Sequence, residues 1–190
     1  MISPNEGNES AASSVNLTDL VAKVFKSGGW LQNALSLEHR PEQEAMAKAV
    51  SKSMVSDQAL IFEAGTGVGK SLAYLVPGII HSMESKRPAV ISSNTIALQE
   101  QVEQKDLPIC RRLFQAIPEL NAYAHFKSTL LVGKGNYLCP TRLGNAIVNK
   151  TELFPNDELE ELQRIATWSQ LTKTGLRQEL NPTPNWDVWE

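Results

Sequence analysis

One glycine-rich run constrains the fold of this 190-residue chain more than any other feature: Ala64-Gly65-Thr66-Gly67-Val68-Gly69-Lys70-Ser71. Its alternating glycines let the backbone curl so that successive N–H groups point toward one centre. A helix beginning near Lys70 would add its free N–H groups and the positive end of its dipole. Lys70 would place its charge between the β- and γ-phosphates, and the Ser71 hydroxyl would be one ligand of Mg²⁺. The run therefore predicts a phosphate-binding loop (P-loop, Walker A) for ATP or GTP with magnesium.

The alternative interpretation of this run is a flexible glycine turn. Ala or Gly, four residues, then Gly-Lys and Ser or Thr should arise by chance in about 1% of chains this long. Here a short apolar run, residues 59–62, precedes the glycines, and an amphipathic stretch, residues 70–83, follows them. A strand before and a helix after favour the phosphate loop, although they do not identify a reaction.

The apolar runs along the chain predict the fold class. Ala59-Leu60-Ile61-Phe62 is short and continuous, as expected of a strand buried on both faces of a parallel sheet. Further strands are expected over 89–93 and 129–132, with helices over about 70–83, 96–103 and 106–116 between them. Alternating strands and helices predict an α/β domain with a mostly parallel sheet, although three strands are few for a doubly wound sheet.

Helices are also expected on both sides of this region. Apolar residues from Leu17 to Phe25 repeat at helical spacing, with Asn16 as the cap and Gly28-Gly29 as the stop. Pro41 suits the first residue of a second helix. Two more helices are expected over about 140–149 and 157–171, before an irregular end containing Trp186 and Trp189. Residues 1–15 have almost nothing to bury and predict a disordered tail.

The composition of the chain excludes few classes of function. The formal net charge of −3 shows no basic excess, which is weak evidence against nucleic-acid binding because a local groove can still be positive. The first residues lack an export signal, and no apolar run approaches the roughly 20 residues that span a bilayer. With two cysteines and no secretory signal, we expect a cytoplasmic protein with reduced thiols and no membrane partner.

Four segments together resemble one family, the DinG-type helicases, which are bacterial XPD-like iron–sulfur DNA helicases of superfamily 2. In chain order the segments are Arg40-Pro41-Glu42-Gln43 with the preceding Gly28-Gly29 stretch, Glu63 to Ser71, Ser92-Ser93-Asn94-Thr95 with Ala97 to Gln101, and Gly133-Lys134-Gly135-Asn136-Tyr137-Leu138-Cys139. The resemblance covers about residues 20–143 well and the rest loosely.

The resemblance implies a fold and a domain organisation. Residues 16–132 would be the amino-terminal part of a RecA-like, ATP-binding motor lobe, and residues 133–190 the truncated beginning of an iron–sulfur domain. The expected fold is thus an incomplete RecA-like P-loop NTPase lobe with a parallel sheet, plus the start of an iron–sulfur domain. The parent would be a monomer that hydrolyses ATP, binds single-stranded or forked DNA, and unwinds DNA 5′-to-3′ in DNA repair.

The resemblance also implies residue roles. Gln43 would read the adenine edge, with Arg40 beside it in the nucleotide site, and Lys70 would be the catalytic residue. Taken alone, Gln43 is more simply an exposed helix residue. Ser93, Asn94, Thr95 and Gln99 would hold single-strand phosphates by hydrogen bonds. Without the family, these four could equally be a strand exit and a helix cap.

Cysteine usage limits the iron–sulfur interpretation. By resemblance, Cys139 would be the first ligand of a 4Fe-4S cluster, whereas a lone cysteine is usually a buried inert thiol. Such clusters need about four thiolates, and this chain has two. Cys110 matches no ligand position and is expected in the core. The other ligands would lie beyond Glu190.

Two elements of a working motor are missing from the 190 residues. They contain no Asp-Glu-x-His box to hold Mg²⁺ and orient water, and no second lobe. The leading hypothesis is therefore an amino-terminal helicase fragment that grips ATP and Mg²⁺ without completing catalysis, with poor stability on its own because residues 59–62 would lack a strand partner. The alternatives are a non-catalytic nucleotide- or DNA-binding remnant and, less well supported, an unrelated P-loop kinase.

Overall fold

The computed structural model describes residues 16–150 and 154–189, so the predicted tail, residues 1–15, lies outside the described residues. The chain divides after Leu130 into two compact units, each of which is described by itself. The first unit carries the glycine-rich run and the second carries Cys139.

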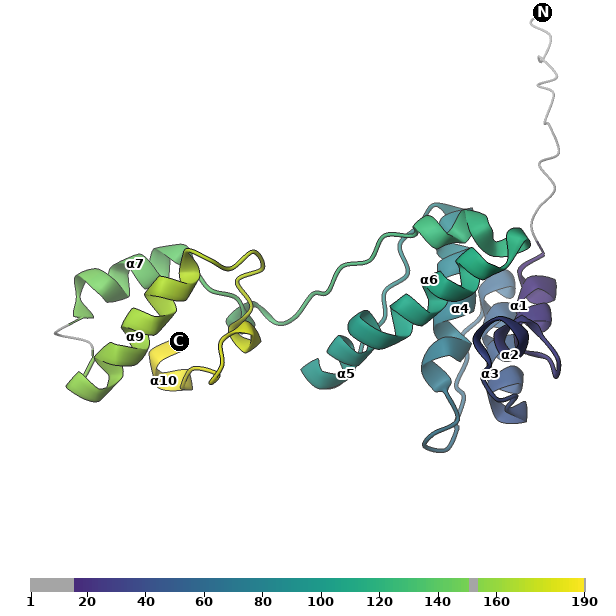
Figure 1. The fold of residues 1–190 in the computed structure, drawn as a ribbon, viewed down its shortest axis with the longest axis horizontal. Helices are drawn as coiled ribbons and strands as arrows, with labels where there is room; N and C mark the ends of the chain where they lie inside the picture. The colour runs from purple at the N-terminus through teal and green to yellow at the C-terminus, as the bar shows by residue number, and fades with distance from the viewer. Residues whose placement is uncertain (1–15, 151–153, 190) are drawn as a thin grey trace, which may run out of the picture. The chain divides into compact units, whose positions relative to one another are not determined.

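The described elements of the first unit are all helical (Figure 1). Its helices are α1 (Leu17–Phe25), α2 (Trp30–Leu35), α3 (Pro41–Ser56), α4 (Lys70–Ser85), α5 (Ile96–Gln101) and α6 (Leu107–Ala116). A π-helical turn, Val102–Asp106, joins α5 to α6, and a 3₁₀ segment, Pro118–His125, follows α6.

The sequence predicted α1 correctly, together with its cap. The Asn16 side chain accepts a hydrogen bond from the Asp19 backbone N–H at 3.2 Å, which satisfies one free donor of the first turn. Pro41 begins α3, where the absent proline N–H costs nothing because that position has no partner within the helix. Residues 30–35, for which the sequence predicts no helix, form α2, whose Leu31 is buried.

The core of the first unit lies around α4. Six consecutive residues of that helix, from Leu75 to Ile80, are buried, so the helix is covered on more than one side. It packs against α1, α3 and α6, whose apolar faces complete the core. The fully buried side chains include Val21, Val24, Leu75, Val76, Ile80, Leu113, Phe114 and Leu120.

The predicted parallel sheet is wrong. The described residues contain no strand, and the one isolated bridge joins Tyr137 to Leu176. The three expected strands, residues 59–62, 89–93 and 129–132, are non-helical segments with no backbone pairing to one another. Their apolar side chains face solvent: Ile61 is 100% exposed, Val90 89% and Leu131 75%. A strand exists through hydrogen bonds to a neighbouring strand, and no such neighbour is present in the described part of the chain.

The helix expected over about 106–116 is α6, which begins at Leu107. The backbone of Asp106 is helical, with φ −77° and ψ −41°, and its side chain makes no capping bond. The π-helical turn before it continues the backbone helix, so the first N–H groups of α6 need no side-chain cap.

In the described part of the second unit, the longer helices are α7 (Pro140–Val148) and α9 (Asn156–Ser169), as the sequence predicted. Its chain end forms a short helix, α10 (Trp186–Trp189), where irregular structure was expected. Leu162, Ile165, Leu180 and Val188 form its small core. The Trp189 indole N–H donates to the Gly135 carbonyl at 2.6 Å and ties α10 to the start of the unit.

Among the described residues, no helix combines the length and the apolar character that crossing a bilayer would need.

A candidate nucleotide-binding loop and its surroundings

The glycine-rich run forms a turn that leads directly into α4. Gly67 and Gly69 have φ of 79° and 82°, in the left-handed region that residues with a Cβ rarely adopt. Gly69 is the N-cap of α4, and Val68 between the two glycines is buried. The local geometry thus follows from the glycine positions, and it places the free N–H groups of the first turn of α4 beside the loop.

Lys70, the first residue of α4, makes hydrogen bonds to the loop that precedes it. Its Nζ donates to the carbonyl oxygens of Gly65 at 2.7 Å and Ala64 at 3.0 Å. An ammonium group has three donors, and two of them are engaged here. The ammonium group of Lys70 therefore lies beside the turn. An anionic ligand there would compete with the two carbonyls for the ammonium group.

The other residues of the run occupy the same turn. Thr66 is exposed, and Ser71, the second residue of α4, is half-buried. The position of Ser71 in the first helical turn is compatible with a hydroxyl ligand to a cation beside bound phosphate. The role of these residues in binding stays a prediction.

Two side chains from the start of α3 reach the loop. The Gln43 amide Nε2 donates to the Gly69 carbonyl at 2.8 Å, and the Arg40 guanidinium donates to the Gly67 carbonyl. Gln43 is only 5% exposed, so the interpretation of this residue as an exposed helix position is wrong. Both residues that the family resemblance placed at the nucleotide site thus lie against the glycine run, although their contact with a nucleotide stays a prediction.

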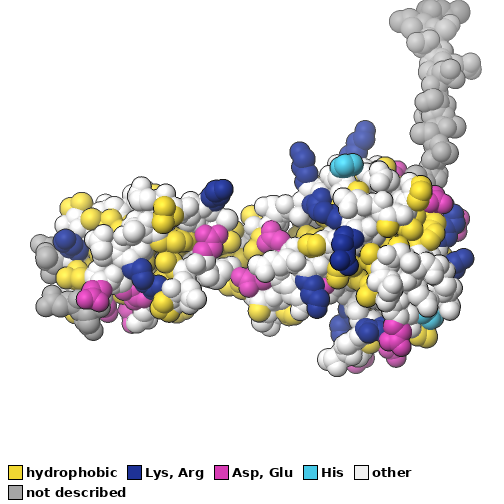
Figure 2. Space-filling view, viewed as in Figure 1, with side chains coloured by type: hydrophobic (Ala, Val, Ile, Leu, Met, Phe, Trp, Pro, Cys, Tyr) yellow, Lys and Arg dark blue, Asp and Glu magenta, His cyan; other side chains and the backbone are white. Residues whose placement is uncertain are grey.

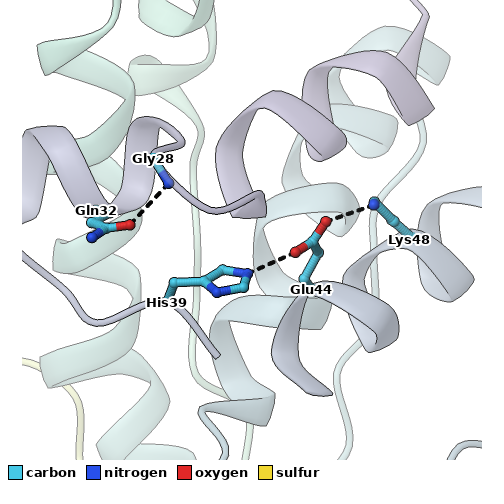
Figure 3. Close-up of polar contacts among 5 residues, drawn as sticks. All are labelled: Gly28, Gln32, His39, Glu44 and Lys48. Carbon is cyan, nitrogen blue, oxygen red and sulfur yellow. Dashed lines mark hydrogen bonds and ion pairs between the residues drawn. The ribbon is translucent and has the colours of Figure 1, made fainter. Parts of the chain in front are cut away.

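An ion-pair cluster beside Arg40 was not predicted from the sequence (Figure 3). Glu44 lies between His39 Nε2, 2.7 Å away, and Lys48 Nζ, 2.6 Å away. Hydrogen bonds from Lys48 and His39 lower the pKa of the Glu44 carboxyl. The spacing of Glu44 and Lys48, four residues apart on one helix, could have indicated this pair, whereas His39 precedes the helix and gave no such pattern.

The segment predicted to bind single-stranded DNA forms the start of α5. Thr95 is its N-cap and accepts a hydrogen bond from the Leu98 N–H at 3.3 Å. The Gln99 amide donates to the Ser93 carbonyl at 3.4 Å. The helix-cap interpretation is therefore correct for Thr95, the strand-exit interpretation is wrong, and DNA contact stays a prediction. Asn94 is exposed.

Figure 2 shows Lys and Arg side chains on the visible face of the first unit, mixed with acidic and apolar ones.

The two cysteines differ in environment. Cys139 is exposed and precedes α7 in the second unit. Cys110 is fully buried on α6, as expected, and desolvation raises the pKa of its thiol to about 12, with Asp106 adding to the effect. Within the described residues, no three His, Cys, Asp or Glu side chains are arranged to hold a metal ion. The residues of this chain therefore do not fit a 4Fe-4S cluster by themselves, because two cysteines cannot supply four thiolates.

No protein-family model matches this chain. It is 36% identical to the ATP-dependent helicase DinG of Mycobacterium tuberculosis (strain ATCC 25618 / H37Rv) over 162 residues, covering 78% of this chain and 24% of the relative. It is 34% identical to the ATP-dependent DNA helicase DinG of Escherichia coli (strain K12), over 79% of this chain and 22% of that protein. It is 34% identical to the ATP-dependent DNA helicase YoaA of Haemophilus influenzae, over 82% of this chain and 22% of that protein. The chain thus spans about a quarter of the length of the curated relatives it matches.

Proposed function

Because this chain is related by sequence to the DinG-type ATP-dependent helicases over about four-fifths of its length, we propose that it is the ATP-binding portion of a helicase of that type, acting on DNA. The observation that carries the proposal is the loop itself. Two glycines with positive φ open onto the first turn of α4, and the Lys70 ammonium lies across the loop carbonyls.

The loop fits the phosphates of a nucleotide chemically. Converging N–H groups, a helix N-terminus and one ammonium are the donors that a triphosphate accepts from. Lys70 would bind the β- and γ-phosphates in place of its present carbonyl partners, and Ser71 would be a ligand of the accompanying Mg²⁺. The magnesium ion would supply charge neutralisation between the phosphates.

The proposed activity of the chain alone is binding without turnover. Its 190 residues contain no Asp-Glu-x-His box, so an acidic partner for Mg²⁺ and a group to orient the attacking water are lacking. ATP hydrolysis, binding of single-stranded or forked DNA, and DNA unwinding belong, in this proposal, to the longer proteins that the relatives represent. A kinase activity has no support in the comparisons.

Equilibrium binding of a fluorescent ATP analogue, with and without Mg²⁺, tests this function on the purified chain. The wild type should bind, and Lys70→Ala should weaken binding by about tenfold or more, the size of a charge-assisted hydrogen bond. Lys52→Ala removes an equal charge from an exposed position on α3 and is the matched control. Equal affinities for wild type and Lys70→Ala would contradict the proposal, and so would ATP hydrolysis by this chain at helicase-like rates.

A further inference from the structure

Two segments that are far apart in the sequence, residues 84–87 and 123–127, meet at the carboxyl end of α4. The Tyr123 hydroxyl, in the 3₁₀ segment after α6, donates a hydrogen bond to Glu84 Oε1 at 2.6 Å and holds the two segments together. The basic side chains of the two segments are Lys86, Arg87, His125 and Lys127, and all four residues are exposed.

Arg111 of α6 belongs to the same surface and is held in place there. Its guanidinium lies over the Phe126 ring, 4.1 Å from the ring centroid, and its Nη1 donates to the Ala124 carbonyl at 3.2 Å. A guanidinium has five N–H donors, and the bond to Ala124 uses one of them. Because stacking already fixes the plane of the group, it loses little freedom when it binds an anion. We call Arg111 and the four exposed residues the basic patch.

The basic patch differs in charge from the chain as a whole. The chain has a formal net charge of −3, whereas the patch contains four Lys and Arg residues together with His125. The acid within the two segments is Glu84, whose carboxylate accepts the hydrogen bond from Tyr123. Figure 2 shows Lys and Arg side chains and a His on the visible face of the first unit. A local concentration of positive charge on an acidic chain attracts polyanions.

The basic patch is remote from the glycine loop. The helix α4 begins beside the loop and runs for 16 residues to Ser85. At 1.5 Å per residue, its two ends therefore lie about 24 Å apart. A ligand at the patch does not occupy the nucleotide site, and the patch shares no residue with the segment 93–99, for which single-strand contact stays a prediction.

The aromatic rings beneath the basic patch face inward. Tyr123 is 5% exposed and Phe126 is 7% exposed. Proteins bind unpaired bases largely by stacking them on exposed aromatic side chains, whereas a duplex presents its phosphates and keeps its bases stacked inside. Charged side chains without an exposed ring among them therefore favour the phosphate backbone of a duplex.

We propose that the basic patch is a binding surface for the phosphate backbone of duplex DNA, separate from the nucleotide loop. The inference goes beyond nucleotide binding and rests on the proposed function for its choice of DNA as the partner. It adds a contact that has no sequence preference, because phosphates carry no sequence information.

Fluorescence anisotropy of the purified chain with a labelled DNA duplex, repeated over a range of salt concentrations, measures this contact. Each phosphate contact contributes about 0.9 to the slope of log affinity against log salt concentration. Arg87→Gln combined with Lys127→Gln should therefore lower that slope by about two. The double variant should also weaken the binding of two duplexes of unrelated sequence by the same factor.

The matched control is Lys26→Gln combined with Lys52→Gln, which removes the same charge from exposed positions outside the basic patch. This control should leave the slope unchanged. The thermal midpoints of wild type and both double variants should be similar, because all four side chains are exposed. Should the double patch variant fail to fold, Lys127→Gln alone carries the test, with an expected change of about one in the slope.

The outcomes for DNA are distinct. A slope that falls for the double patch variant and not for the control supports the inference. Equal slopes for all three proteins, or no duplex binding by the wild type, overturn it. A larger loss on a single strand of the same length would assign the patch to unpaired DNA, and tighter binding of labelled poly-glutamate than of the duplex would assign it to an acidic protein. Either result overturns the inference.

Binding of the fluorescent ATP analogue, measured on the same proteins, keeps the proposed function separate from the inference. The double patch variant should bind the analogue as the wild type does, because the patch is remote from the loop. Failure of the wild type to bind the analogue would contradict the proposed function, whatever the result with DNA. Loss of analogue binding in the patch variant alone would overturn the separation of the two sites.

Discussion

The Tyr123 hydroxyl donates a hydrogen bond to Glu84 Oε1 at 2.6 Å, joining residues that lie 39 positions apart in the chain. Tyr123 belongs to the 3₁₀ segment after α6, and Glu84 lies near the end of α4. The Tyr123 ring is buried and packs edge-on against the ring of Phe114. The hydrogen bond to Glu84 therefore links the core of the first unit to its surface.

Removing this hydroxyl should destabilise the fold at neutral pH. Tyr123→Phe keeps the ring and loses one hydrogen bond, while the exposed Glu84 carboxylate regains water, so we expect a loss of about 1 kcal/mol in the free energy of unfolding. Urea titration followed by circular dichroism measures the change. A variant as stable as the wild type would show that the bond contributes nothing.

The same pair predicts the behaviour of the protein in alkali. Desolvation by burial, and then the bond to Glu84, raise the pKa of Tyr123 above its ordinary value of about 10. Because the folded state holds this proton more tightly than the unfolded state, its contribution is complete below about pH 10 and is lost as the pH rises further. Stability measured from pH 8 to 11 should therefore fall more steeply for the wild type than for Tyr123→Phe.

Glu44 predicts the opposite dependence in acid. Its pKa is lowered by Lys48 and His39, so its contribution is present above its unfolded pKa, about 4.3, and is lost as the pH falls through the folded value. Glu44→Gln should reduce stability at pH 7 by less than about 1 kcal/mol, because the cluster is partly exposed, and should flatten the stability profile below about pH 5. Glu42→Gln, exposed in the same helical turn, is the control, and an identical effect from it would contradict this assignment.

The absence of a buried strand at residues 59–62 can be tested by substitution. Ile61 is fully exposed, so Ile61→Ala should change the free energy of unfolding by less than about 0.5 kcal/mol. Leu75 is fully buried on α4, so Leu75→Ala should lower the free energy of unfolding by about 2 to 5 kcal/mol. Chemical denaturation of both variants measures these values, and a large cost at Ile61 would show that its side chain is buried in solution.

The two cysteines should react at very different rates. Cys139 is exposed, whereas Cys110 is buried with its thiol pKa raised to about 12. Since the thiolate is the reactive form, a disulfide reagent such as dithionitrobenzoate should modify one thiol quickly in the native protein and the second only on unfolding. Cys139→Ser should abolish the fast phase, and a fast phase that survives this change would place Cys110 at the surface.

Local patterns in the sequence predicted the helices well. The cap at Asn16, the proline at the start of α3 and the glycine turn before α4 are each decided by interactions within a few residues, and the structure contains all three. The strand predictions failed because a continuous apolar run such as residues 59–62 has no feature of its own that supplies a hydrogen-bonding neighbour.

The sequence by itself determined the turn of the glycine run, since Gly67 and Gly69 can adopt positive φ at little cost, and it determined the helix that follows. Only the tertiary structure decided what lies behind that turn. Arg40 and Gln43 are 27 and 26 residues away from the carbonyls they bond, and the packing of α3 against α4 brings them there. Contacts of that separation depend on how helices pack in three dimensions, and the order of residues along the chain does not encode them in a locally readable pattern.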